Sequence, residues 1–148
     1  MESKKQKVSE GLGRLLADTY ILYLKTHNFH WNITGPLFAS LHLLFEKQYL
    51  ELFAAVDEIA ERIRALGFVA PGTNKQFAAL ASIKETEGVP TADQMVKILY
   101  EDHCLVDKTV HVVFKLAEEA HDQGTMDLMV KRMEIHEKTA WMLKSQLA

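Results

Sequence analysis

The sequence predicts an all-α protein, a four-helix bundle with one short extra helix in the long connection between its second and third long helices. Only 3 Pro and 7 Gly interrupt the 148 residues, which favours long helices. Apolar residues recur at helical spacing along four long segments, and two short turns and one long connection join them. That connectivity is typical of a bundle with a single crossover, and the length fits one domain spanning residues 1–148.

The first two long helices are predicted from their apolar stripes. Residues 5–33 form the first helix, which "TGP" at 34–36 ends. Its stripe consists of Val8, Leu12, Leu15, Leu16, Thr19, Leu22 and Tyr23. Residues 37–66 form the second helix, with apolar positions at Phe38, Leu41, Phe45, Leu52, Val56, Ile59, Ile63 and Leu66. Gly67 follows two arginines in the last turn, which indicates a helix C-terminus there.

The remaining helices follow a mixed segment, residues 67–90. Within this segment, "TNKQFAALAS" predicts a short helix capped by Thr73 or Asn74. The third long helix is predicted from about residue 92 to about residue 122. The sequence "QGT" then turns the chain, and Thr125 is expected to cap a last helix that continues through "WMLKSQ".

The composition argues against several classes of protein. The net charge of −3 gives no general electrostatic reason to bind nucleic acid or an acidic membrane. The longest apolar runs are too short to span a bilayer, and "MESKKQKVSE" lacks the apolar centre of a signal peptide. A single cysteine, Cys104, cannot form an intrachain disulfide. These features favour a cytoplasmic protein that does not interact with a membrane.

Polar residues with metal-binding chemistry lie within the second helix. At about 100° of rotation per residue, Glu46, Asp57 and Glu61 lie roughly 40°, 60° and 100° around the helix from His42, so all four share one face. His42 and Glu61 are nevertheless 19 residues apart, roughly 28 Å along the helix axis. A metal ion bonded at about 2.0–2.6 Å cannot use both ends of one helix.

A second copy of the chain would bring the two ends together. If two such helices pack antiparallel about a twofold axis, the numbers of facing residues add to a constant. The numbers 42 and 61 add to 103, and 46 and 57 give the same total. An axis near residues 51 and 52 therefore places His42 and Glu46 of one subunit beside Asp57 and Glu61 of the other.

The types of residue indicate which metal such a site would hold. Imidazole with several carboxylates and no thiolate suits iron, zinc or manganese and argues against a structural zinc site. A carboxylate-rich site with few His ligands suits Fe(II) that is oxidised and then released as Fe(III). Each residue alone also fits a structural role, since acidic pairs are common on solvated helix faces and Glu61 can pair with Arg62 or Arg64. Because both pairs of residue numbers add to 103, the metal site is favoured over these separate structural roles.

The same segment carries a family resemblance. The sequence "HNFHWNITGPLFASLHLLFEKQYLEL", followed by "DEIAERIRALG", closely resembles the Dps family, the dodecameric mini-ferritins. The specific pattern is H-W-N-x-x-G-x-x-F-x-x-L-H-x-x-F-E followed by D-x-x-A-E-R, and the likeness covers essentially the whole chain. The resemblance implies a ferritin-like fold, with ferroxidase ligands at His30, His42 and Glu46 of one subunit and at Asp57 and Glu61 of its twofold mate. Some members have Asp at the position of Glu46, a difference of one methylene.

The resemblance also implies a function, iron storage and detoxification. Fe(II) would be oxidised to Fe(III) at the intersubunit sites, preferably by hydrogen peroxide, and stored as ferric oxyhydroxide inside a hollow dodecamer, which protects against oxidative damage. Zinc is a candidate competitor for the sites. In similar proteins, acidic residues near the start of the last helix line iron-entry pores, which points to Asp127 and Asp122. Asp127 equally fits the first-turn acid that a helix dipole favours.

The sequence also bears on DNA binding and on two alternative functions. Some family members bind DNA through flexible Lys-rich tails, and residues 1–7 here include Lys4, Lys5 and Lys7. Because this tail is short and the chain is net acidic, DNA binding is expected to be weak or absent. One rival is a DNA-compacting structural particle with little ferroxidase role. The other is a di-iron protein with its site inside one bundle, which needs two Glu-x-x-His motifs, whereas the sequence has only Glu118 to His121.

Overall fold

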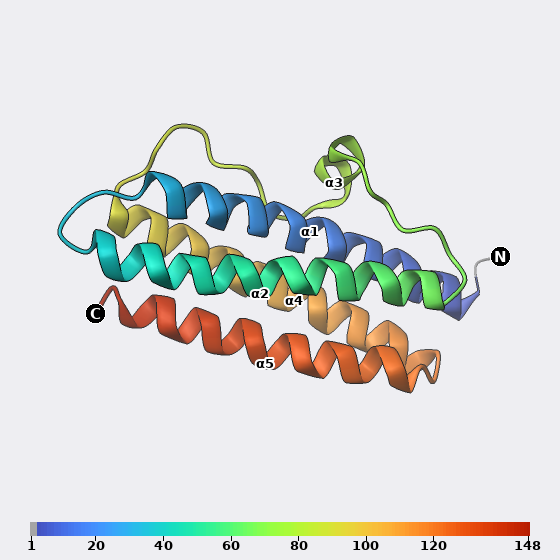
Figure 1. Cartoon of the computed structure of the whole chain (residues 1–148). Helices are drawn as coiled ribbons and strands as arrows, with labels where there is room; N and C mark the ends of the chain where they lie inside the picture. Colours follow the sequence, from blue (N-terminus) through green and yellow to red (C-terminus); the bar gives the residue numbers. More distant parts are fainter. Residues whose placement is uncertain (1–2) are drawn as a thin grey trace.

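Four long helices pack side by side in the computed structural model, which describes residues 3–148 (Figure 1). They are α1 (Lys4–Asn32), α2 (Phe38–Ala65), α4 (Ala92–Glu119) and α5 (Gln123–Ser145). The short helix α3 (Asn74–Leu80) lies in the connection from α2 to α4, which runs outside α1 from one end of the bundle to the other (Figure 1). The predicted all-α four-helix bundle with one extra short helix is therefore confirmed.

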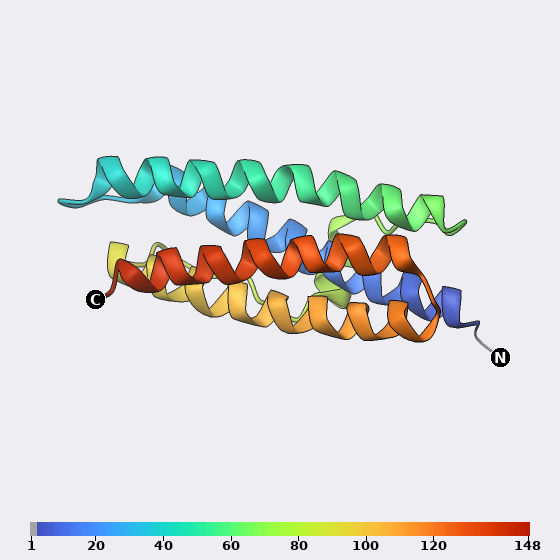
Figure 2. The same ribbon diagram turned by 90° about the horizontal axis from the view of Figure 1, so that it is seen from below.

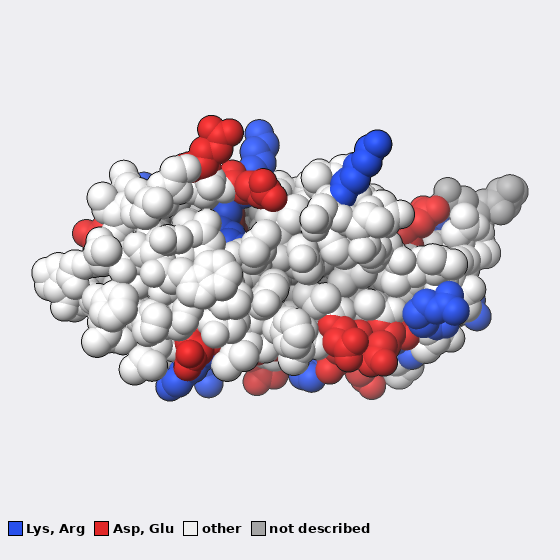
Figure 3. Space-filling model, turned by 45° about the horizontal axis from the view of Figure 1, so that its top comes forward, with Lys and Arg blue, Asp and Glu red and all other residues white. Residues whose placement is uncertain are grey.

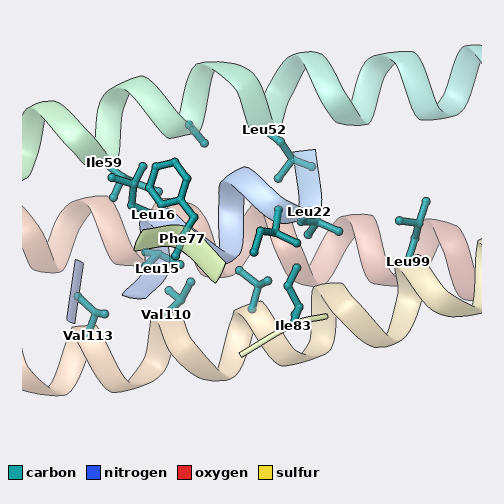
Figure 4. Close-up of a cluster of buried hydrophobic side chains, with 14 of the residues drawn as sticks. Leu15, Leu16, Leu22, Leu52, Ile59, Phe77, Ile83, Leu99, Val110 and Val113 are labelled. Carbon is teal, nitrogen blue, oxygen red and sulfur yellow. The ribbon is translucent and has the colours of Figure 1, made fainter. Parts of the chain in front are cut away.

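The bundle has two layers of paired helices. The hairpin of α1 and α2 forms one layer, and the hairpin of α4 and α5 forms the other (Figure 2). Apolar side chains from both layers and from the long connection meet between them (Figure 4). Those labelled in Figure 4 are Leu15, Leu16, Leu22, Leu52, Ile59, Phe77, Ile83, Leu99, Val110 and Val113, and all are buried. Each such side chain contributes about 1.5–3 kcal/mol by leaving water.

Buried polar contacts hold the long connection against the bundle. The carboxylate of Asp18, in α1, accepts hydrogen bonds from the backbone N–H and the hydroxyl of Ser82 at 2.6 and 2.7 Å. It also accepts one from the Thr109 hydroxyl of α4 at 2.8 Å. Phe77 of α3 inserts its ring into the core nearby, 7% exposed. One carboxylate therefore joins α1, the connection and α4.

Most helix ends follow the sequence signals, and the start of α5 does not. α2 ends at Ala65 and Gly67 has a φ of +98°, as expected for a stop at this glycine. Thr73 is the cap of α3, and its side chain accepts from the Gln76 amide. The prediction that Thr125 caps the last helix is wrong. Asp122 is the cap, because its carboxylate accepts from the Thr125 amide at 3.1 Å.

The turn before α5 also lies earlier than predicted. α4 ends at Glu119 rather than near residue 122, and the "QGT" segment forms the first turn of α5 instead of the loop. The chain reverses over residues 120–122, where His121 has a φ of +54°. A left-handed residue after a helix stops it without glycine, which is why the sequence pattern did not indicate this end.

The N-terminal segment is mostly helical rather than a flexible tail. α1 begins at Lys4, and Ser3 caps it by accepting from the Gln6 amide at 3.0 Å. Lys4, Lys5 and Lys7 therefore lie exposed in the first turns of a helix, while residues 1–2 of the predicted tail lie outside the described residues. Within residues 3–148, no helix is both long and apolar enough to cross a membrane.

Candidate metal centre

Two of the predicted ligands meet where α1 ends and α2 begins. The Nδ1 atom of His30 donates to the backbone carbonyl of His42 at 2.7 Å, and the Nδ1 atom of His42 donates to the carbonyl of His30 at 2.7 Å. The two rings stack with centroids 3.8 Å apart and planes 13° from parallel. These reciprocal bonds are possible because the short turn after Asn32 folds α2 back along α1.

The reciprocal bonds fix the tautomer of both rings. A carbonyl oxygen only accepts, so each Nδ1 must carry a proton, and in the neutral ring Nε2 has the lone pair. Metal-binding histidines commonly use one ring nitrogen for the metal and donate the other N–H to a backbone carbonyl or carboxylate. His30 is 7% exposed and His42 is half-buried, so the pair lies at the edge of the bundle. The arrangement can supply two oriented nitrogen donors.

The predicted carboxylates are divided between the two ends of α2. Glu46 is half-buried and lies one turn after His42, whereas Asp57 and Glu61 are exposed near the other end. α2 is one unbroken helix from Phe38 to Ala65, so the roughly 28 Å between His42 and Glu61 holds within one chain. The structure brings His30 and His42 together and leaves Asp57 and Glu61 far from them in the same chain.

The surface between these two ends of α2 is apolar. Leu43, Leu50 and Phe53 are 56%, 54% and 61% exposed. By helical rotation they lie roughly 20° to 100° around α2 from His42, on the face that carries the acidic residues. Figure 3 shows a broad uncharged surface over α1 and α2, with the largest group of acidic atoms toward the C-terminal end of α2. Large exposed apolar side chains rimmed by charge are typical of a protein interface.

Aromatic rings pack against the histidine pair. His27 stacks on Tyr49 with centroids 4.0 Å apart and lies 4.0 Å from the Trp31 ring. Burial lowers the pKa of His27, and the neighbouring His30 lowers it further. His27 thus packs among aromatic rings beside the histidine pair. Trp31 is 59% exposed beside the pair.

The two candidate pore residues differ in their surroundings. The Asp122 carboxylate accepts from Arg62 at 2.7 Å and from the Thr125 hydroxyl at 2.5 Å. Burial raises the pKa of Asp122, but the bonds from Thr125 and the charge of Arg62 outweigh it, so the pKa lies below its usual value. Asp127 is exposed, and it lines one groove between α2 and α5 together with Glu61. Asp127 is thus accessible to a cation, while Asp122 is already engaged.

A buried polar network that the sequence argument missed crosses the centre of the bundle. Arg132 is 1% exposed and donates to Glu51 at 2.6 Å and to Nε2 of His136 at 3.1 Å. The Nδ1 atoms of His136 and His103 lie 2.9 Å apart. Desolvation lowers the pKa of His103 to about 3 and also lowers that of His136, so both rings are neutral. A guanidinium in this position disfavours a metal ion inside the single bundle.

A signal for this network was present in the sequence. Arg132 and His136 are four residues apart and fall on the buried stripe of α5, which also contains Met129, Ala140 and Leu143. The rival motif, in contrast, does not form a site. Glu118 is exposed in the last turn of α4 and His121 is exposed beyond its end. Among residues 3–148, one group of three metal-ligating side chains gathers within a chain, formed by Asp107, His111 and Glu137.

Comparisons with known proteins agree with this architecture. A model of the ferritin-like domain family matches residues 9–148. The chain is 42% identical over 146 residues to an uncharacterized low temperature-induced protein of Nostoc sp., covering 97% of this chain and 82% of that protein. It is 37% identical over 142 residues to DNA protection during starvation protein 2 of Bacillus anthracis, covering 96% and 97%.

Solved structures also resemble this chain closely. The fold matches a Dps protein from Bacillus brevis with a TM-score of 0.96 at 36% identity, covering 100% of both chains. It matches a Dps protein from Vibrio cholerae O1 with a TM-score of 0.94 at 32% identity, covering 98% of this chain and 91% of that one. The latter is described as a member of a broad superfamily of ferritin-like diiron-carboxylate proteins.

Proposed function

Because this chain belongs to the Dps family within the ferritin-like superfamily, we propose that it is a ferroxidase that oxidises Fe(II) and stores the ferric product. One observation carries the proposal: a histidine at the end of α1 and another at the start of α2 both donate Nδ1–H to a carbonyl and so leave Nε2 for a metal, and two carboxylates lie at the other end of α2. The histidine end has one carboxylate, Glu46, and the other end has no histidine, so the carboxylate-rich mixed set that suits Fe(II) oxidation needs both ends.

The proposed site forms between two copies of the chain. His30, His42 and Glu46 of one subunit are completed by the Asp57 and Glu61 side chains of a second copy. The apolar side chains between the two ends of α2 support this pairing, because an antiparallel copy centred near residues 51 and 52 would cover them. We further propose that such dimers assemble into the dodecamer that the family resemblance implies.

The substrate of this site is Fe(II), and the proposed oxidant is hydrogen peroxide. Two Fe(II) ions each lose one electron, and peroxide accepts both electrons together with two protons. The O–O bond breaks and two waters form, so no hydroxyl radical is released. Ferric ions then hydrolyse and deposit as oxyhydroxide in the cavity of the shell. Zn(II), which prefers the same nitrogen and oxygen donors, is expected to compete.

The residues of the chain contribute orientation and charge. The carbonyl bonds of the histidine pair hold both imidazoles with Nε2 available before any ion arrives, which reduces the reorganisation that binding requires. The carboxylates compensate the added charge as Fe(II) becomes Fe(III). We assign the entry route to Asp127 rather than Asp122, because Asp127 is exposed in the groove that also contains Glu61.

Fe(II) oxidation in the assembled protein tests the function. After addition of Fe(II) and peroxide, the double variant His30→Ala, Asp57→Ala is expected to lose at least about tenfold in the initial rate of ferric product formation. Glu118→Ala is the matched control, because it removes an exposed acid that only the single-bundle alternative uses. The assignment is wrong if the double variant oxidises iron as fast as the parent, and a loss in Glu118→Ala would favour the rival site.

DNA binding remains a second candidate function only because relatives carry the name DNA protection during starvation protein. The three N-terminal lysines lie in helix α1, and the chain has a net charge of −3, so we expect weak or no binding. A gel shift at low salt measures it. A clear shift that disappears in a variant lacking residues 1–7 contradicts this expectation.

A further inference from the structure

We propose that Asp107, His111 and Glu137 form a second cation site, on the surface where α4 meets α5, for a divalent first-row transition ion such as Zn(II) or Fe(II). These residues take no part in the ferroxidase site proposed above, and the inference does not rest on it. Asp107 and His111 are four residues apart on α4, so their side chains project from the same face one turn apart. Glu137 approaches them from α5.

The spacing of the three donor atoms fits one shared ion. Nε2 of His111 lies 3.4 Å from Oδ2 of Asp107 and 3.9 Å from Oε2 of Glu137, and all three donor atoms lie within 4.8 Å of one another. Donors around a tetrahedral metal are separated by roughly 3.3–3.6 Å, since the bonds are about 2.0–2.2 Å long. The observed distances exceed the usual span of a hydrogen bond, about 2.7–3.2 Å. Glu137 is largely exposed, so a small rotation of its side chain completes the set.

A buried oxygen provides independent support for a bound cation. Oδ1 of Asp107 is inaccessible to solvent and has no hydrogen-bond partner. Leaving a buried carboxylate oxygen unpaired is costly. A cation held by both oxygens of the carboxylate would satisfy the buried one, as carboxylates often do at metal sites.

The chemistry of the donors limits which ion fits. One imidazole with two carboxylates suits Zn(II), Fe(II) or Mn(II), whereas Mg(II) and Ca(II) prefer oxygen donors only. The competing explanation is a protonated His111 that forms ion pairs with the two carboxylates. That explanation predicts no metal at this position, so counting bound metal separates the two.

Zinc stoichiometry of the intact assembly tests the inference. Parent protein and variants are dialysed against Zn(II) in the presence of excess Mg(II), and bound zinc is counted by elemental analysis. The parent is expected to bind one Zn(II) per chain more than His111→Ala or Asp107→Asn. Glu101→Gln, which removes an exposed acid roughly 120° from Asp107 and 80° from His111 around α4, is expected to bind as much as the parent. Far-ultraviolet circular dichroism verifies that all variants remain helical.

The result is independent of the ferroxidase proposal, because these variants keep every residue of that site. Anomalous diffraction from a zinc-soaked crystal is expected to show a peak bounded by Asp107, His111 and Glu137. Equal zinc content in the parent, His111→Ala and Asp107→Asn overturns the inference, as does an anomalous map without this peak. Loss of zinc in Glu101→Gln equal to that in His111→Ala also overturns it, because the loss would then reflect general surface charge.

Discussion

The division of ligands between the ends of α2 leads to a quantitative prediction for mixed assemblies. His42→Ala and Asp57→Ala each remove a ligand from every proposed site, so each variant alone is expected to be nearly inactive. In an assembly of equal amounts of both chains, half of the dimers pair unlike chains. One site of such a pair then lacks both ligands, and the other site lacks neither. A quarter of all sites are complete, so activity is expected to recover to roughly 25% of the parent.

This recovery depends on sharing between subunits. The roughly 28 Å between His42 and Glu61 along an unbroken helix prevents the two ends of one chain from forming the same site. If each site lay inside one chain, every chain in the mixture would carry a defective site, and no site would be complete. Recovery therefore distinguishes the shared site from every arrangement inside a single bundle.

The assay uses chains with different tags that are coexpressed and purified together. The initial rate of ferric product formation is followed by absorbance after addition of Fe(II) and peroxide. A mixture of His42→Ala with Glu46→Ala is the control, because both residues belong to the same half of the site and every site remains defective. If the His42→Ala and Asp57→Ala mixture is no more active than either variant alone, the proposed pairing is refuted. Recovery in the control refutes it as well.

Three further predictions concern stability. Burial lowers the pKa of His103 from its ordinary value of 6.5 to about 3 in the folded chain, so the unfolded chain takes up the proton first, and stability present above pH 6.5 is lost as pH falls toward 3. His103 should contribute about 2 kcal/mol to the loss of unfolding free energy at pH 5, measured by denaturant unfolding, which His103→Gln removes while the contribution of His136 stays; an unchanged pH dependence in the variant contradicts this. Asp18→Asn cannot accept all four hydrogen bonds of the carboxylate, so it is expected to cost about 1–3 kcal/mol and to speed hydrogen exchange in residues 81–91; unaltered exchange there argues against this role. In Gly124→Ala the new Cβ would lie 2.9 Å from Nη2 of Arg62, so the guanidinium must shift and weaken its bonds to Asp122 and Thr125, at an expected cost of about 1 kcal/mol; a melting temperature equal to the parent's contradicts this.

The helices could be predicted because their signals are local. Apolar stripes of helical period indicated α1, α2 and α4, and the Thr73 side chain and Gly67 marked ends that the structure confirms. The start of α5 was misplaced because two residues competed for one role. Asp122 and Thr125 both have capping oxygens, and only the fold shows that the Asp122 carboxylate accepts from the Thr125 amide.

The candidate site could be predicted only as far as one helix determines it. Rotation per residue placed His42 and Glu61 on one face, and this is a property of α2 alone. The reciprocal bonds between His30 and His42 depend on how α1 and α2 approach each other, which no single-helix pattern contains. The gathering of Glu137 with residues of α4 was missed for the same reason, because the partners are distant in sequence.

The uninterrupted length of α2 has a consequence for how the two proposed sites of a dimer respond to iron. The sites are centred near residues 44 and 59 of each helix, roughly 22 Å apart by helical rise. Electrostatic influence in physiological salt decays over about 8 Å, so a cation at one site barely alters the potential at the other. The sites should therefore fill without cooperativity, with a Hill coefficient of about one. An assembly built this way takes up iron in proportion to supply, with no threshold concentration to cross.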